Sequence, residues 1–341
     1  YYDFIQNLPI FLPVGNIGNY FSELLDKYPV TPYLESRQSL VRWTHFIHNK
    51  INVYLGKPEL TYYQAMNNYY EHYKLKQVKN IIITKPQKLD CGKEISNFPL
   101  AYETYGKLNQ KKDNAILVFH ALSGDQFASD INPITNKEGW WNFAVGPDKA
   151  LDTNNFFIIC ANVIGGCMGS YGPSTIDPKT DKAFGTTFPV ITINDMVNAQ
   201  FNLLEFFGIE KLFAVIGGSM GGMQVLQFVS NFPDKAKIAI PIACAASHSA
   251  QNIAFNELGR QAIMADINWK DGLYEENKTN PDKGLAVARM AAHITYLSKK
   301  GLEDKFGRKL QEKDNLNFSF DADFQIESYL RYQGSVFVDR F

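Results

Sequence analysis

The sequence predicts an α/β fold, a doubly wound parallel sheet with helices on both faces, between a small all-α segment and a helical cap. Three observations predict it. Helical patterning without cysteine fills residues 1–78, and short apolar runs alternate with amphipathic stretches in residues 79–245. A mostly helical stretch, long for a connection between strands, then occupies residues 246–341. We therefore expect three domains with these boundaries.

The first domain carries a strong helix signal. A helix should begin at Ser36 and continue to about Leu55, where Gly56 and Pro58 end it. Its apolar residues recur at helical spacing: Leu40, Trp43, Ile47 and Ile51. A second helix is expected over residues 62–73, and a linker over residues 75–80 closes the domain.

The second domain has four short apolar runs, which we predict to be strands. They cover residues 115–120, 156–163, 212–216 and 238–242. Uninterrupted apolar strands are typical of parallel sheets that are buried on both faces. Between the second and third strands, Asn194 and Asp195 are expected to cap an amphipathic helix that Gly208 closes.

Composition excludes several classes of function. With 341 residues and a formal net charge of −1, the protein has no general attraction for nucleic acid or an anionic membrane. No apolar run approaches the ~18 residues of a transmembrane helix. The four cysteines lack metal-ligand spacing, so we predict no metal site, ordinary packed thiols and a cytoplasmic location. Because Tyr1 is not an initiator methionine, the chain is expected to begin inside a longer protein.

A glycine-flanked serine at residues 217–221 is typical of a nucleophile elbow. Ser219 follows an apolar strand and precedes a helix, which would expose its hydroxyl on a sharp turn. Acyl transfer also needs two N–H donors for the oxyanion, and these are expected from Met220 and from Leu122 in the loop after the first strand. A purely structural turn is the alternative. His120 is expected to position the loop rather than to react.

Several longer motifs resemble the homoserine O-acetyltransferase family across residues 80–341. They are His120–Asp125, Asn162–Ser170, Tyr171–Ser174, Phe188–Pro189 and Gly217–Gln224. The resemblance implies an α/β-hydrolase fold with an inserted helical cap and a ping-pong reaction of methionine biosynthesis. Ser219 would accept the acetyl group of acetyl-CoA and pass it to the γ-hydroxyl of homoserine, without a further cofactor. It also implies a homodimer held through the cap.

The segment Gly284–Met290 is similar to the same family, and the resemblance assigns Arg289 to the carboxylate of the amino acid. A guanidinium suits this task because it forms a bidentate fork. Spacing alone favours a helix-surface ion pair for Arg289. Arg260 is a weaker candidate and is expected to be a helix-face charge.

The family's catalytic acid and histidine follow the serine in the order Ser, Asp, His. His248 and His293 are the histidines after Ser219, and neither has the family position. We therefore expect a C-terminally truncated fold whose Asp and His lie beyond residue 341. Without a base the serine is a poor nucleophile, so turnover should be weak or absent.

Residues 1–78 resemble Erv-type sulfhydryl oxidases, above all at Arg42–Lys57. The resemblance implies an FAD site with these residues: His48, Asn49, Asn52 and Lys57. The family's redox cysteines would fall at Val14 and Ile17, so dithiol exchange is excluded. A redox-inert helical domain is the favoured interpretation, with His48 satisfied within its core.

Two other outcomes stay open for the whole chain. One is a related enzyme of the same fold: a serine O-acetyltransferase, a homoserine O-succinyltransferase or an esterase. The other is a flavin-binding scaffold whose acyltransferase part is inert.

Overall fold

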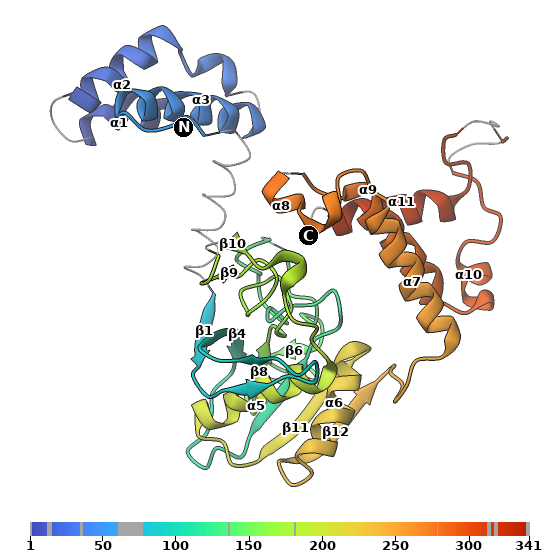
Figure 1. Ribbon diagram of the computed structural model, residues 1–341. Helices are drawn as coiled ribbons and strands as arrows, with labels where there is room; N and C mark the ends of the chain where they lie inside the picture. Colours follow the sequence, from blue (N-terminus) through green and yellow to red (C-terminus); the bar gives the residue numbers. More distant parts are fainter. Residues whose placement is uncertain are drawn as a thin grey trace. The chain divides into compact units, whose positions relative to one another are not determined.

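The computed structural model describes residues 2–11, 16–34, 37–60, 78–135, 137–180, 182–277, 279–311, 315–316 and 320–338. The chain divides into two compact units, Tyr1–Lys76 and Gln77–Phe341. Figure 1 shows the first unit as helices and the second as a sheet with flanking helices, followed by further helices.

The first unit is helical, as predicted. Its elements are α1 (Tyr2–Phe11), α2 (Asn16–Lys27), the 3₁₀ helix η1 (Thr31–Tyr33) and α3 (Arg37–Tyr54). Helix α3 lies within one residue of the predicted bounds at each end. Apolar residues of α2 and α3 form the core, and the buried Trp43 donates its indole N–H to Tyr28 O at 3.0 Å. The helix expected over residues 62–73 lies outside the described residues.

A six-stranded sheet forms the centre of the second unit, in the order β1-β4-β8-β5-β11-β12 (Figure 1). The strands are β1 (Lys79–Ile83), β4 (Phe98–Tyr105), β5 (Ala115–Phe119), β8 (Phe157–Ala161), β11 (Leu212–Gly218) and β12 (Ala236–Ile242). Strands β8, β5, β11 and β12 are parallel, which confirms the α/β prediction. Three short pairs lie outside this sheet: β2 (Gln87–Lys88) with β3 (Glu94–Ile95), β6 (Val145–Gly146) with β7 (Leu151–Asp152), and β9 (Ile176–Asp177) with β10 (Lys182–Ala183).

Two strands of the sheet were not predicted. Strands β1 and β4 pair antiparallel with each other, and β4 pairs antiparallel with β8. Residues 79–80, expected in a linker, are the first residues of β1. Strand β1 mixes buried and exposed positions and begins with Lys79 and Asn80, whereas β4 mixes buried and half-buried positions and contains Glu103 and Thr104. They therefore lack the continuous apolar run by which the other four were found.

The central strand β5 is buried on both faces. Leu117 and Phe119 enter one apolar cluster, whereas Ile116 and Val118 enter the other. Strand β12 differs from the prediction, because its apolar side chains are exposed: Ile238 is 44% exposed and Ile240 39%. Within the described residues β12 pairs only with β11, so it forms the edge of this sheet.

Helices α5 (Ile193–Phe207) and α6 (Met220–Asn231) pack against each other beside the sheet, after the 3₁₀ helix η2 (Gly185–Thr187). The N-cap of α5 is Thr192 rather than Asn194. Thr192 has an extended backbone and its hydroxyl accepts the N–H of Asp195, whose carboxylate accepts the N–H of Thr192 in return. This reciprocal capping box satisfies two free donors. Gly208 closes the helix with φ 65°, as predicted.

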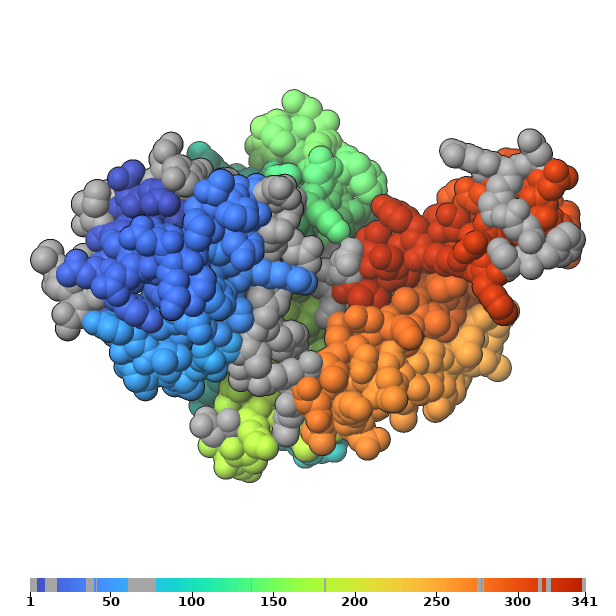
Figure 2. Space-filling view, turned by 90° about the horizontal axis from the view of Figure 1, so that it is seen from above, coloured from blue at the N-terminus to red at the C-terminus, as the bar shows by residue number. Residues whose placement is uncertain are grey.

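The cap segment, residues 246–338, is mostly helical. It contains α7 (Ala250–Met264), η3 (Lys270–Gly272), α8 (Tyr274–Asn277), α9 (Asp282–Thr295), α10 (Lys299–Lys305) and α11 (Gln325–Val338). Helix α9 contacts both α7 and α11, and Figure 2 shows these helices as one orange-to-red body. The helices approach closely because Gly284 faces the backbone of Ala262, where a Cβ would stand 2.5 Å from the carbonyl oxygen.

Candidate active site

Ser219 occupies a strained turn between β11 and α6. Its backbone has φ 55° and ψ −121°, a region that residues other than glycine rarely adopt and that costs about 1–3 kcal/mol. The neighbouring sheet holds the turn in place, since Ser219 N–H donates to Ile242 O at 2.9 Å. Its carbonyl accepts the N–H of Met223 at 3.1 Å in the first turn of α6. Ser219 is exposed, as a nucleophile at an elbow must be.

The glycines around Ser219 let the helix start directly on the sheet. A Cβ on Gly221 would stand 2.0 Å from Phe119 O, and one on Gly217 would stand 2.5 Å from the Gly221 carbonyl carbon. No side chain fits in either place. The first turn of α6 is therefore in contact with the end of β5.

The two proposed oxyanion donors belong to segments that meet at this point. Met220 is the first residue of α6, where N–H groups have no partner within the helix. Leu122 lies in the loop after β5, and Phe119 of β5 is paired with Gly217 of β11. The register thus brings the loop beside the elbow. Leu122 itself is 79% exposed.

His120 is buried and holds the loop from within. Its Nδ1 is 2.7 Å from Ala121 O, and its Nε2 accepts the N–H of Val163 at 3.1 Å. Since Nε2 accepts, the proton lies on Nδ1, which donates to Ala121 O. These contacts give His120 a positioning task at the end of β5.

Gln224 and Gln200 are polar residues of the site that sequence reasoning missed. Gln224 is fully buried on α6, and its Oε1 accepts from Gln200 Nε2 at 2.7 Å. Its Nε2 is 3.3 Å from His120 O and 3.4 Å from Met220 O. The sequence did contain a signal for Gln224: an amide side chain among apolar residues, about one helical turn after Ser219.

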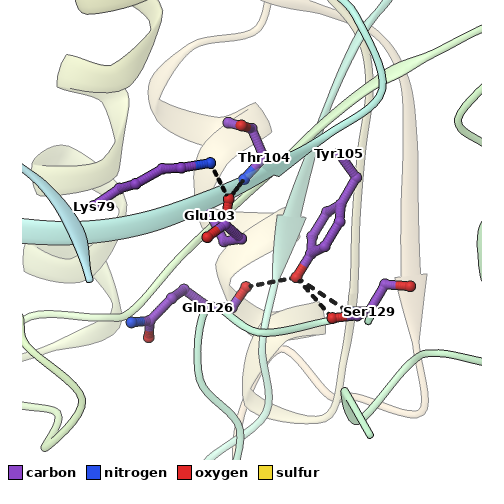
Figure 3. A network of polar contacts seen from close by, with 6 residues as sticks. All are labelled: Lys79, Glu103, Thr104, Tyr105, Gln126 and Ser129. Carbon is purple, nitrogen blue, oxygen red and sulfur yellow. Dashed lines mark hydrogen bonds and ion pairs between the residues drawn. The ribbon is translucent and has the colours of Figure 1, made fainter. Parts of the chain in front are cut away.

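A second polar network lies farther along the same loop (Figure 3). Tyr105 of β4 accepts the N–H of Ser129 at 3.1 Å, and its hydroxyl is 3.4 Å from Gln126 O. Burial raises the pKa of Tyr105 far above its ordinary value, so the phenol stays neutral. Near it, Glu103 pairs with Lys79 and accepts the N–H of Thr104. The network fastens the loop to β4.

Arg289 lies on α9 and makes its contacts inside the cap segment. Its Nη1 donates to Tyr296 Oη at 3.0 Å, and its guanidinium carbon is 5.1 Å from the Phe337 ring centroid. Tyr296 and Phe337, rather than the carboxylate of a helix-surface ion pair, therefore position Arg289. Its Nε is buried and has no hydrogen-bond partner among the described residues. Arg260, by contrast, forms the expected surface pair with Glu257.

Among the described residues, neither His248 nor His293 forms a hydrogen bond with Ser219. His248 is exposed, and its Nδ1 lies 3.4 Å from Asn256 Nδ2. His293 lies in the cap segment, where Nδ1 is 2.9 Å from Tyr329 Oη. Burial, and then the charges of Arg289 and Lys305, lower the pKa of His293.

The four residues expected to bind FAD lie at the end of α3 and in the turn after it. Both polar atoms of the Asn49 amide bind the backbone of Leu60: Nδ2 donates to Leu60 O at 2.6 Å, and Oδ1 accepts Leu60 N–H at 2.9 Å. Asn52 is buried, whereas His48 and Lys57 are exposed. His48 is therefore not satisfied within the core, contrary to the expectation for a purely structural domain. Two of the four side chains are accessible to a ligand.

Neither a metal cluster nor a membrane span was found where the structure can be described. In the described ranges, no three His, Cys, Asp or Glu side chains gather as they would around a metal ion. Likewise, none of the helices described above is both long and apolar enough to cross a membrane.

Two protein-family models match the chain. The model of the alpha/beta hydrolase fold matches residues 114–337, and that of the Erv1 / Alr family matches residues 1–73. The first match contains the turn at Ser219, the loop that includes Leu122 and most of the cap segment. The second contains all of α1, α2 and α3.

Curated relatives resemble the second unit closely. The homoserine O-acetyltransferase of Pelagibacter ubique is 78% identical over 264 residues, which are 77% of this chain and 71% of that protein. The enzyme of the same name from Mesorhizobium japonicum is 61% identical over 257 residues, 75% of this chain and 66% of that protein. The chain thus spans about two thirds of the length of these relatives.

Solved structures agree on the fold. Esterase E22 has a TM-score of 0.65 at 29% identity, covering 77% of each chain. The homoserine O-acetyltransferase of Bacillus anthracis has a TM-score of 0.65 at 26% identity, covering 77% of this chain and 74% of that one. With its α/β-hydrolase core, its elbow at Ser219 and these relatives, the chain belongs to the homoserine O-acetyltransferase family.

Proposed function

We propose that this protein is an acyltransferase that moves the acetyl group of acetyl-CoA to the γ-hydroxyl of homoserine through an acyl-Ser219 intermediate. The observation that carries the proposal is the strained, exposed Ser219 at the start of α6, beside the loop that contains Leu122. Close relatives named homoserine O-acetyltransferase support the choice of substrates. The reaction would serve methionine biosynthesis.

The proposed chemistry has two half-reactions. Ser219 Oγ attacks the thioester carbonyl, and the N–H groups of Met220 and Leu122 stabilise the oxyanion. The C–S bond breaks, the thiol of CoA leaves with a proton, and the acetyl ester of Ser219 remains. The homoserine hydroxyl then attacks this ester and regenerates the serine. A base must accept the Ser219 proton, and we assign it to neither His248 nor His293, whose contacts lie elsewhere.

We assign the carboxylate of homoserine to Arg289. Tyr296 occupies Nη1 and Phe337 covers a face of the guanidinium, which leaves the edge formed by Nε and Nη2. That edge suits a bidentate bond with a planar carboxylate. The unpartnered, buried Nε supports this assignment, because a buried donor without an acceptor costs about 1–3 kcal/mol.

Intact-protein mass spectrometry after mixing with acetyl-CoA tests the proposal. Because neither His248 nor His293 serves as the base, we expect slow accumulation of up to one acetyl group per chain, located on Ser219 by peptide mapping, and its loss when homoserine is added. Ser219→Ala should abolish the adduct. An unmodified wild-type protein, or an adduct that survives in Ser219→Ala, would overturn the assignment.

An esterase is the second candidate, because solved esterases share this fold at 29% identity. In that case water, rather than homoserine, would release the acyl group. CoA or alcohol release should be measured with homoserine, with serine and with water alone. Equal rates in all three favour the esterase, whereas stimulation by serine alone or preference for succinyl-CoA favours the corresponding transferase.

For the first unit we propose a small helical domain in which FAD binding is the function to test. The Erv1 / Alr match supports it, together with the exposed His48 and Lys57. The sequence has no cysteine before Cys91, so dithiol chemistry is not proposed for this unit. A purified protein with flavin absorbance that disappears in a His48→Ala, Lys57→Ala variant would support binding. A colourless protein that takes up no added FAD would refute it.

We also propose a division of the second unit into a core, residues 79–245, and a cap that begins at residue 246 and mediates a homodimer. Exposed apolar side chains on two cap helices support the dimer: Ile253, Leu258 and Met264 on α7, and Val287 and Ile294 on α9. Light scattering after gel filtration should give twice the chain mass. Ile253→Glu with Val287→Glu should give the monomer, and a wild-type monomer would contradict the proposal.

A further inference from the structure

We infer that Gln224 is a positioning residue that sets the spacing of the two oxyanion donors, an inference that rests on the proposed acyl-Ser219 chemistry. The two donors come from separate segments, Met220 from the start of α6 and Leu122 from the loop after β5. Gln224 is fully buried, and its side chain contacts both segments.

The amide of Gln224 is oriented by a neighbour on another helix. Gln200 of α5 donates its Nε2 to Gln224 Oε1 at 2.7 Å, which turns the Gln224 NH₂ group the other way. The Nε2 atom of that group donates to both His120 O, at 3.3 Å, and Met220 O, at 3.4 Å. One amide thus ties the carbonyl at the root of the loop to the carbonyl of the first helical residue.

His120 holds the next peptide group along the loop, the one between Ala121 and Leu122. The carbonyl of Ala121 accepts from His120 Nδ1 at 2.7 Å and from Gly124 N–H at 2.8 Å. The same peptide unit carries the N–H of Leu122. In a planar trans peptide the C=O and N–H bonds point in opposite directions, so holding the carbonyl of Ala121 aims the Leu122 N–H away from His120.

The consequence is a rigid pair of donors with a fixed separation. Oxyanion donors act when they lie about 2.7–3.1 Å from the developing charge, and a displacement of about 1 Å costs about a hundredfold in rate. Loss of the Gln224 amide would let the loop move relative to α6. Substrate binding elsewhere would not change, because Gln224 is buried beneath the turn.

Pre-steady-state acylation by p-nitrophenyl acetate tests this in Gln224→Met, which keeps the length of the side chain but removes both donors. We expect the acylation rate constant to fall about tenfold to hundredfold, with less than about a twofold change in the dissociation constant of the ester. Gln227→Met is the matched control, since its half-buried amide lies on the same helix but donates to Asn231 Oδ1 at 2.8 Å, away from the start of α6 and from the Leu122 loop. The control should acylate at the wild-type rate. Equal rates in Gln224→Met and wild type would overturn the inference.

An NMR measurement separates failure of this inference from failure of the proposed function. The backbone amide resonances of Leu122 and Met220 should shift in Gln224→Met and stay in place in Gln227→Met, whether or not the wild-type protein is acylated. Imidazole ¹⁵N shifts should place the His120 proton on Nδ1. Unshifted Leu122 and Met220 amides in Gln224→Met refute the clamp even if Ser219 is active, whereas shifted amides in a protein that acetyl-CoA does not modify refute only the proposed function.

Discussion

Gly221 lies directly against the backbone of Phe119: a Cβ at residue 221 would stand 2.0 Å from the Phe119 carbonyl oxygen. This contact joins the helix that carries Met220 to the strand that leads into the loop containing Leu122. It involves two backbones, so neither side can move away as a flexible side chain would. The spacing of the proposed site thus depends on the absence of a single methyl group.

Gly221→Ala is therefore expected to destabilise the second unit. Forcing a methyl group into a closely packed place costs about 1–3 kcal/mol, and we expect a loss of that size in the free energy of unfolding. Gly218→Ala is the control, because a Cβ there has no atom within 4 Å. Urea unfolding followed by circular dichroism measures both. Equal midpoints for the two variants would contradict the close contact.

Ser219→Gly should stabilise the protein relative to Ser219→Ala. Both variants remove the hydroxyl, but only glycine adopts φ 55°, ψ −121° without strain. The expected gain is about 1 kcal/mol, the lower end of the cost of such a conformation. Thermal unfolding of the two variants provides the measurement. A lower midpoint for Ser219→Gly would show that the turn stores no strain.

Tyr105→Phe should weaken the second unit because it leaves the buried N–H of Ser129 without its acceptor. Such a loss costs about 1–3 kcal/mol in the free energy of unfolding. Tyr102→Phe is a suitable comparison, since the Tyr102 ring packs edge-on against Phe207 and phenylalanine keeps that contact. Denaturant unfolding should show a lower midpoint for Tyr105→Phe alone. Similar losses in both variants would argue against the network in Figure 3.

Acid should destabilise the cap segment through His293. Burial lowers its folded-state pKa, and the facing groups Arg289 and Lys305 add to the effect while Tyr329 is its hydrogen-bond partner. In the unfolded chain His293 has its ordinary pKa of about 6.5, so below that pH it binds more protons than it does in the folded protein. The stabilisation is therefore complete above that pH and is lost as the pH falls through the folded-state pKa. His293→Asn should flatten this part of the stability profile. A titration of His293 by NMR at or above its ordinary pKa would contradict the prediction.

The sequence predicted the elements whose signal is local. Strands β5, β8 and β11 are continuous apolar runs, and α3 has helical spacing and a glycine stop, so each was found close to its observed bounds. Strands β1 and β4 were missed because polar residues keep each from being a continuous apolar run. The N-cap of α5 was displaced by two residues, because threonine, asparagine and aspartate all suit that position and only the backbone of Thr192 distinguishes them.

For the site, too, the sequence predicted the residues with a local signal and missed those whose role depends on distant contacts. Ser219 and Met220 follow from a motif of five adjacent residues, and Leu122 from its place after a strand. Gln224 could not be assigned a task, because two of its partners are distant in sequence: His120 lies 104 positions away and Gln200 lies 24 positions away. The ring contacts of Arg289 likewise depend on how α9 packs against α11.

The sequence by itself determined the alternation of strands and helices, the helical character of the first unit and the serine that marks the elbow. These follow from backbone preferences and apolar spacing over a few residues. The tertiary structure alone decided that the Leu122 loop lies beside Met220, that Gln224 joins them, that β12 is exposed and that Arg289 contacts aromatic rings. Such relationships depend on strand order and register, which bring together residues that no local pattern connects.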